Sequence, residues 1–138
     1  MQYNYDFEIA SLLIMTIILL HFVFVRQFPG EKTRVFGWLL FVCEAECLMN
    51  ILSCVGLANA AFVPQRLNEV LAFAFFVLEG ASSYLIYRYF MAACALRGRE
   101  RTVFAAVGMI PFAVFLVLVA VTPVTGFFYY FRDGSYYQ

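Results

Sequence analysis

The sequence predicts an all-α integral membrane protein, a bundle of four transmembrane helices, and its composition and its four long apolar stretches carry that prediction. Of the 138 residues, 64% are hydrophobic and only 13% are charged, whereas ordinary soluble domains have about 25% charged residues. A soluble domain of this size buries only about two thirds of its unfolded surface. It could not hide this much apolar side chain, so we expect the lipid bilayer to surround most of the chain.

Four segments are long enough to cross a membrane. A spanning helix needs about 20 mostly apolar residues, because the hydrocarbon layer is about 30 Å thick and a helix rises about 1.5 Å per residue. Segments of this kind cover residues 7–28, 35–57, 68–91 and 103–121. We expect the first to end at Pro29 and the fourth at Thr122-Pro123, which leaves Pro111 as the one proline inside a span. Their length and the need for closed backbone hydrogen bonding in lipid favour helices over barrel strands.

Basic residues between these segments predict the orientation, since short cytoplasmic loops collect Lys and Arg. The first and third connections hold Arg26, Lys32, Arg34, Arg97, Arg99 and Arg101. The second connection offers only Arg66, and the segment after the fourth helix offers only Arg132. We therefore expect the N-terminus outside and, after four crossings, residue 138 outside as well.

The composition also limits the function classes. Nine Lys plus Arg balance nine Asp plus Glu, so no basic field points to nucleic acid as a partner. The four cysteines, Cys43, Cys47, Cys54 and Cys94, lie in apolar stretches and suggest no disulfide framework. No H-E-x-x-H, G-x-S-x-G or phosphate-loop motif is present in the sequence. We expect no catalytic residues and no cofactor, and a receptor or scaffold is favoured over an enzyme.

Two glutamates, Glu46 and Glu79, fall near the middle of the second and third segments and so near the same depth. An ionisable side chain at the bilayer centre costs about 2.5 to 3.5 kcal/mol on insertion scales, so each one needs a partner, a proton or a watery cavity. Asn50 shares a helical face with Glu46, and Ser83 shares one with Glu79. Because buried carboxyls can exchange protons near neutral pH, Glu46, Asn50, Glu79 and Ser83 are the candidate ligand-sensing or proton-sensing residues.

A structural role for the same residues is the alternative. Protonated Glu46 and Glu79 could hydrogen-bond to Asn50, Ser83 or a backbone carbonyl and thereby hold helices together. Glu44 lies two residues from Glu46, about 200° around the helix, and is expected to face a different neighbour.

Three further polar groups receive conservative interpretations. Cys43, Glu46 and Cys47 have a spacing that could hold a soft metal, but no histidine accompanies them, and we expect no metal site. His21, near the cytoplasmic end of the first helix, is expected to pack or to face the interface. Arg88 is expected to extend toward the headgroups, because its depth disfavours an ion pair with a mid-membrane glutamate.

The residues also carry a resemblance to a family. Four stretches, QYNYDFEIA at 2–10, HFVFVRQFP at 21–29, RLNEVLAFAF at 66–75 and TPVTGFFYYF at 122–131, resemble the N-terminal membrane region of GGDEF-domain diguanylate cyclases of clostridia-like bacteria. The last stretch is also similar to the seven-helix input region that precedes some sensor histidine kinases.

This resemblance implies a sensory region of the bacterial cytoplasmic membrane with an outside N-terminus and seven helices. A cytoplasmic output domain that makes cyclic di-GMP would follow. The present chain would then hold the first four helices in one module, residues 1–138, and we expect it to be truncated at the aromatic tail. The implied partners are the remaining C-terminal helices, the output domain and, in one arrangement, a second copy in a homodimer.

The favoured interpretation is a non-catalytic input region of a bacterial signalling protein. A ligand or a proton would act in a cavity bounded by the four candidate residues and covered by the aromatic outer loop, and would shift the helix packing. A fragment of a proton-coupled transporter would use the same carboxyls to couple substrate to protons. A complete four-helix protein that assembles with a partner is the third hypothesis.

Overall fold

The computed structural model describes residues 6–25, 30–59, 62–94, 98–132 and 135–137. Its four helices are α1 (Asp6–Phe24), α2 (Glu31–Ala58), α3 (Gln65–Ala93) and α4 (Gly98–Thr125). All four are long enough and apolar enough to cross a membrane. The prediction of a helical fold with four membrane-length helices is confirmed. A short antiparallel hairpin, β1 (Tyr130–Arg132) paired with β2 (Ser135–Tyr137), follows α4 and was not predicted.

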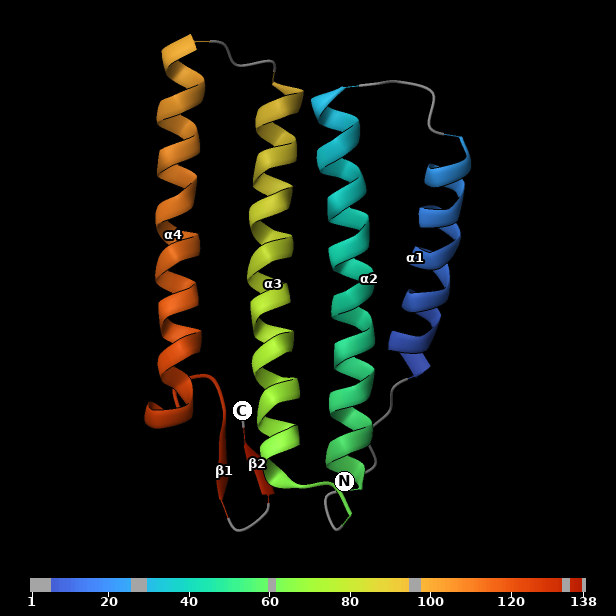
Figure 1. Ribbon diagram of the computed structural model, residues 1–138, viewed down its shortest axis with the longest axis vertical. Helices are drawn as coiled ribbons and strands as arrows, with labels where there is room; N and C mark the ends of the chain where they lie inside the picture. The colour runs from blue at the N-terminus through green and yellow to red at the C-terminus, as the bar shows by residue number, and fades with distance from the viewer. Residues whose placement is uncertain (1–5, 26–29, 60–61, 95–97, 133–134, 138) are drawn as a thin grey trace.

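The helices stand side by side in chain order and form an open row rather than a closed bundle (Figure 1). The most extensive packing joins α2 to α3, and the contacts of α1 with α2 and of α3 with α4 are smaller. The row therefore leaves many apolar side chains exposed, as Leu13 on α1, Trp38 on α2 and Ile110 on α4 illustrate. Such a surface suits lipid or further protein and would be unfavourable in water.

The helices extend beyond the predicted apolar stretches at their charged ends. Helix α2 begins at Glu31 instead of residue 35, and α4 begins at Gly98 instead of residue 103. The added turns contain Lys, Arg and Glu, which are good helix formers that an apolar criterion does not count. The predicted end of the first helix falls at residues 26–29, which lie outside the described residues.

The predicted end of the fourth helix at Thr122-Pro123 is wrong, because α4 continues through Pro123 to Thr125. A proline in the last turn removes only one backbone donor. The helix ends instead at Gly126, which has a left-handed φ of 66° and whose N–H donates to the Thr122 carbonyl at 2.7 Å. Glycine adopts that conformation without a steric penalty and commonly terminates helices in this way. Pro111 is therefore not the only proline within a span.

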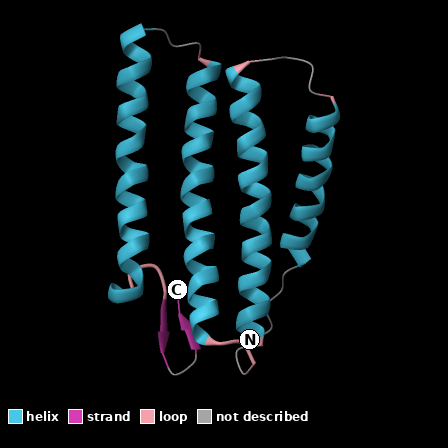
Figure 2. Ribbon diagram, viewed as in Figure 1, coloured by secondary structure: helices cyan, strands magenta, loops and turns pink. Residues whose placement is uncertain are grey.

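The hairpin lies beside the start of α3 and the end of α4 (Figure 2). The buried core consists of Ala72 and Phe76 of α3, Val119 of α4, and Tyr129. The Phe76 ring stacks on Phe128 and on Tyr129, with centroid distances of 5.3 and 5.6 Å. Val119 of α4 is fully buried beside them. The aromatic segment after α4 therefore packs back onto the helices that precede it.

The two ends of the row differ in charge. The first turns of α2 and α4, which carry Lys32, Arg34, Arg99 and Arg101, lie at one end, and Arg66 at the start of α3 lies at the other (Figure 1). Arg26 and Arg97 lie outside the described residues. The orientation of the row in a membrane stays a prediction.

Candidate functional site

Polar side chains join α1 to α2 at two levels. The Thr16 hydroxyl donates to the Glu44 carboxylate at 2.5 Å. Farther along, the Asn50 amide donates to the Glu8 carboxylate at 3.4 Å. Glu44 therefore faces α1, as its separation from Glu46 around the helix predicts. Asn50 belongs to this α1–α2 contact and not to the α2–α3 contact.

The two glutamates predicted to lie at one depth are on α2 and α3. The Glu46 carboxyl lies beside the Ser82 hydroxyl, and Glu79 is within electrostatic range of it. Ser82 is buried, and its hydroxyl donates to the backbone carbonyl of Glu79 at 2.9 Å. Ser82, rather than the predicted Ser83, is thus the serine that faces α2.

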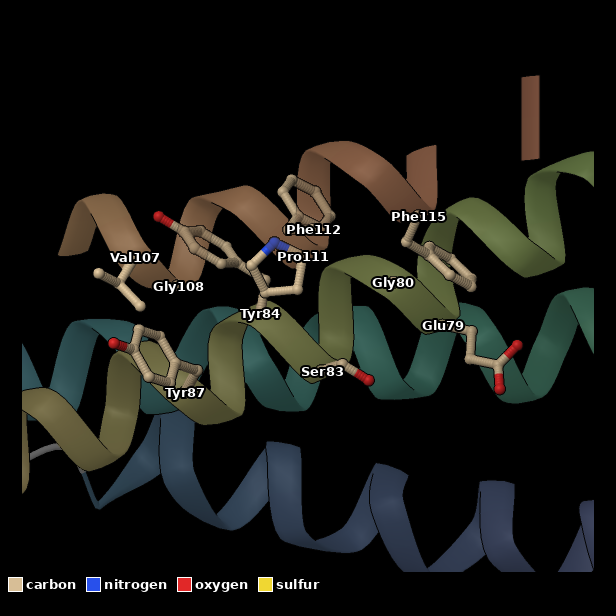
Figure 3. A pocket seen from close by; sticks show the side chains of 10 residues that line it. All are labelled: Glu79, Gly80, Ser83, Tyr84, Tyr87, Val107, Gly108, Pro111, Phe112 and Phe115. Carbon is tan, nitrogen blue, oxygen red and sulfur yellow. The ribbon is translucent and has the colours of Figure 1, made fainter. Parts of the chain in front are cut away.

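A cavity of about 470 Å³ lies between α3 and α4 (Figure 3). We call it the α3–α4 cavity. It lies in the size range of small-molecule sites, roughly 300 to 1,000 Å³. Its walls combine four aromatic rings with few polar groups: Glu79, Gly80, Ser83, Tyr84, Tyr87, Val107, Gly108, Pro111, Phe112 and Phe115. Glu79 and Tyr87 lie at opposite ends of it.

Two glycines bring the walls of the α3–α4 cavity together. A Cβ atom at Gly80 would lie 2.7 Å from the Phe115 ring, and one at Gly108 would overlap the Tyr87 ring. Tyr84 stacks on Phe112 with ring centroids 4.9 Å apart. The absence of side chains at 80 and 108 therefore lets the rings of each helix rest on the backbone of the other.

Pro111 adds a backbone acceptor to the same wall. In a regular helix the N–H of residue 111 would donate to the carbonyl of Val107, and proline has no N–H to donate. Both residues line the α3–α4 cavity. The carbonyl of Val107 is thus left without its usual helical donor.

The basic end of the row is tied by one acidic side chain. Glu31, in the first turn of α2, forms ion pairs with Arg88 of α3, at 3.7 Å, and with Arg101 of α4. Arg88 also donates to the Tyr84 hydroxyl at 3.3 Å, and the Tyr87 hydroxyl donates to the Phe104 carbonyl at 2.6 Å. Arg88 reaches this end of the helices, away from Glu44 and Glu46, as predicted.

Charge and metal sites are limited in the described part of the chain. Both ion pairs found there use Glu31, and no Lys, Arg or His is paired with Glu79. No three His, Cys, Asp or Glu side chains gather to hold a metal ion among those residues, Cys43, Glu46 and Cys47 included. His21 lies exposed in the last turn of α1. Outside the helices, burial and the nearby Glu69 carboxylate raise the pKa of Tyr129.

The four predicted site residues do not surround one cavity. Glu79 and Ser83 line the α3–α4 cavity, Glu46 lies on the α2 side of α3, and Asn50 contacts α1. The aromatic segment after α4 reaches the cavity wall indirectly, through contact of Phe128 with Phe115 at 5.4 Å between centroids.

The sequence analysis missed the aromatic walls of the α3–α4 cavity. A usable signal was present, because Gly80 and Gly108 each lie mid-helix and Pro111 follows one turn after the second. Small residues inside spanning helices commonly mark close helix contacts.

The chain matches no protein-family model, no curated protein and no solved structure.

Proposed function

We propose that this chain is the membrane-embedded input region of a bacterial signalling protein, with a diguanylate cyclase as the output. In this function a ligand or a proton acts at Glu46, Glu79 and Ser83 and changes how α2, α3 and α4 pack. The N-terminus lies outside, and the basic end of the helix row faces the cytoplasm. The resemblance of four sequence stretches to cyclase membrane regions supports the choice of output.

The position of Glu79 is the observation that carries this proposal. Glu79 lies within electrostatic range of Glu46 on α2 and also lines the α3–α4 cavity. A change in its charge or its partner therefore acts on two helix contacts at once. A signal shifts an equilibrium only when it interacts differently with the two states, and a carboxyl shared by two contacts provides such a difference.

The test uses the natural protein that contains this region, produced in bacterial cells and compared with its Glu46→Gln/Glu79→Gln variant. Cyclic di-GMP is measured while the external pH is varied. We expect the output of the unaltered protein to depend on pH and that of the variant to lose this dependence. Glu100→Gln, which removes an exposed carboxylate at the start of α4, should retain it.

Three outcomes would contradict the proposal. An unchanged dependence of cyclic di-GMP output on pH in the double variant would mean that both glutamates have only a structural role. A protein that makes no cyclic di-GMP would remove the cyclase assignment. Proton-coupled uptake of a solute into vesicles that contain the protein would favour the transporter hypothesis.

A further inference from the structure

We infer that the α3–α4 cavity binds an apolar molecule that carries a protonated amine, which is taken from the bilayer. This inference rests on the proposed function and gives the sensed ligand a chemical class. Five features of the cavity carry it: its volume, its aromatic walls, its acceptor groups, the lack of a basic partner for Glu79 among the described residues, and its opening.

The walls favour an aromatic or alkyl body. Tyr84, Tyr87, Phe112 and Phe115 line the α3–α4 cavity, and the volume of about 470 Å³ suits a small molecule. Aromatic faces carry negative charge density, so they attract a cation as well as an apolar group. An anionic ligand would meet the same faces and the carboxylate unfavourably.

The polar groups of the cavity wall can accept hydrogen bonds. Glu79 offers a carboxylate, and the Ser83 and Tyr84 hydroxyls can accept as well as donate. The Tyr87 hydroxyl already donates to the Phe104 carbonyl. An ammonium group, which supplies donors and no acceptors, can therefore be satisfied by this wall.

Glu79 lacks a cation within the described residues, although it lies inside a membrane-length helix. A carboxylate in such a helix is costly unless a partner compensates it. A bound ammonium would neutralise it with a charge-assisted hydrogen bond, which is stronger than a neutral one.

The opening of the cavity indicates where the ligand enters. Glu79, Ser83, Val107 and Pro111 are all exposed on the surface of the helix row. Where this surface meets the hydrocarbon layer, an apolar amine dissolved in lipid reaches the cavity without crossing the protein. Its charged group would then exchange the headgroup region for Glu79.

The test measures binding to the purified full chain in lipid nanodiscs. Three probes share one apolar body and differ in the end group: phenylbutylamine, phenylbutanol and phenylbutyrate. Uptake by empty nanodiscs is subtracted from each. We expect saturable binding of the amine, weaker binding of the alcohol and none of the carboxylate.

Matched variants locate the site. Glu79→Gln should weaken amine binding by about tenfold and leave alcohol binding unchanged, because only a charge-assisted contact is lost. Ser83→Phe should abolish both by filling the space. Glu44→Gln, which removes a carboxyl from the α1–α2 contact instead, should bind like the unaltered chain.

Equal binding of amine and alcohol, or equal amine binding by the Glu79→Gln variant, would overturn the inference. Absence of saturable amine binding would do the same. Cross-linking of a Ser83→Cys variant between copies, above that of the unaltered chain, would make a second copy the occupant. Lack of binding with an intact pH response would leave the proposed function standing, and binding without any signalling effect would leave only this inference.

Discussion

Arg101, in the first turn of α4, pairs with Glu31 in the first turn of α2, although 70 residues separate them. Extensive helix contacts join only chain neighbours, so this ion pair reaches across α3. Arg88 of α3 pairs with the same carboxylate. Glu31 therefore links three helices at the basic end, where the cavity-lining Tyr84 also contacts Arg88.

We predict that Arg101→Gln lowers the free energy of unfolding by up to about 1 kcal/mol, the usual worth of a partly exposed ion pair. The difference from the unaltered chain should shrink as salt rises, because the Debye length falls to about 3 Å at 1 M. Thermal unfolding in detergent at low and high salt measures it. Arg99→Gln, an exposed neighbour outside both ion pairs, is the control and should have a smaller effect at either salt concentration. A loss that does not respond to salt would assign Arg101 a packing role instead.

The Gly108→Ala substitution should lower the free energy of unfolding, although a glycine-to-alanine change inside a helix usually raises it. Replacing a mid-helix glycine with alanine ordinarily stabilises by roughly 0.5 to 1 kcal/mol. Here the new Cβ would overlap the Tyr87 ring, so we predict destabilisation by about 1 to 3 kcal/mol, typical of overpacking. Circular dichroism during thermal unfolding measures the change.

The Tyr87→Ala background provides the matched control for Gly108→Ala. With the ring removed, the added methyl group meets open space, and the alanine should become stabilising. If Gly108→Ala stabilises the chain in both backgrounds, α3 and α4 are not in close contact at this point.

Much of the fold follows from hydropathy, and most of the site does not. An apolar stretch predicts a membrane-length helix and roughly where it begins. Glu46 and Glu79 could therefore be predicted to lie at one depth. It does not fix the rotation of the helix. That rotation depends on contacts such as Gly56 against Asn68, where the backbone of one helix meets a side chain of the other. It decides that Ser82 and not Ser83 faces α2.

The other differences have equally local causes. The hairpin after α4 has three residues per strand, too few to give an alternating pattern that stands out from an aromatic segment. The end of α4 is set by the φ of Gly126 and not by Pro123. Asn50 and Glu46 contact different helices because Asn50 hydrogen-bonds to Glu8, near the start of α1. Glu8 was not predicted to take part in the site.

Thr16→Val should destabilise the contact of α1 with α2. The hydroxyl that donates to Glu44 is lost, and the other carboxylate oxygen of Glu44 is buried without a partner among the described residues. Interhelical hydrogen bonds in membranes are worth about 0.6 kcal/mol on average and at most about 1.7. We expect a loss in the upper half of that range, measured by unfolding in detergent.

A double-mutant cycle separates this hydrogen bond from packing. In a Glu44→Leu background the Thr16→Val change should cost less, because only the hydrogen bond of the hydroxyl to the Leu12 carbonyl within α1 is then lost. Thr102→Val, at the exposed start of α4, is the matched control. Equal costs of Thr16→Val in both backgrounds would show that the contact of the hydroxyl with Glu44 contributes nothing to stability.

The ionisation of Tyr129 should set an alkaline limit to the packing of the aromatic segment after α4. Burial, and to a lesser extent Glu69, raise the pKa of its phenol in the folded chain. The folded state therefore favours the protonated phenol. The resulting stabilisation is complete below the unfolded pKa of about 10 and is lost as the pH rises above it. Ionisation would place a charge against Phe76, on which Tyr129 stacks.

The Tyr129→Phe variant cannot ionise at this position. The unfolding midpoint should therefore fall more steeply with alkaline pH in the unaltered chain than in the variant. Glu69→Gln should show an intermediate slope, because burial, the larger cause, remains. Parallel slopes for all three proteins would mean that this phenol ionises as readily in the folded chain as in the unfolded one.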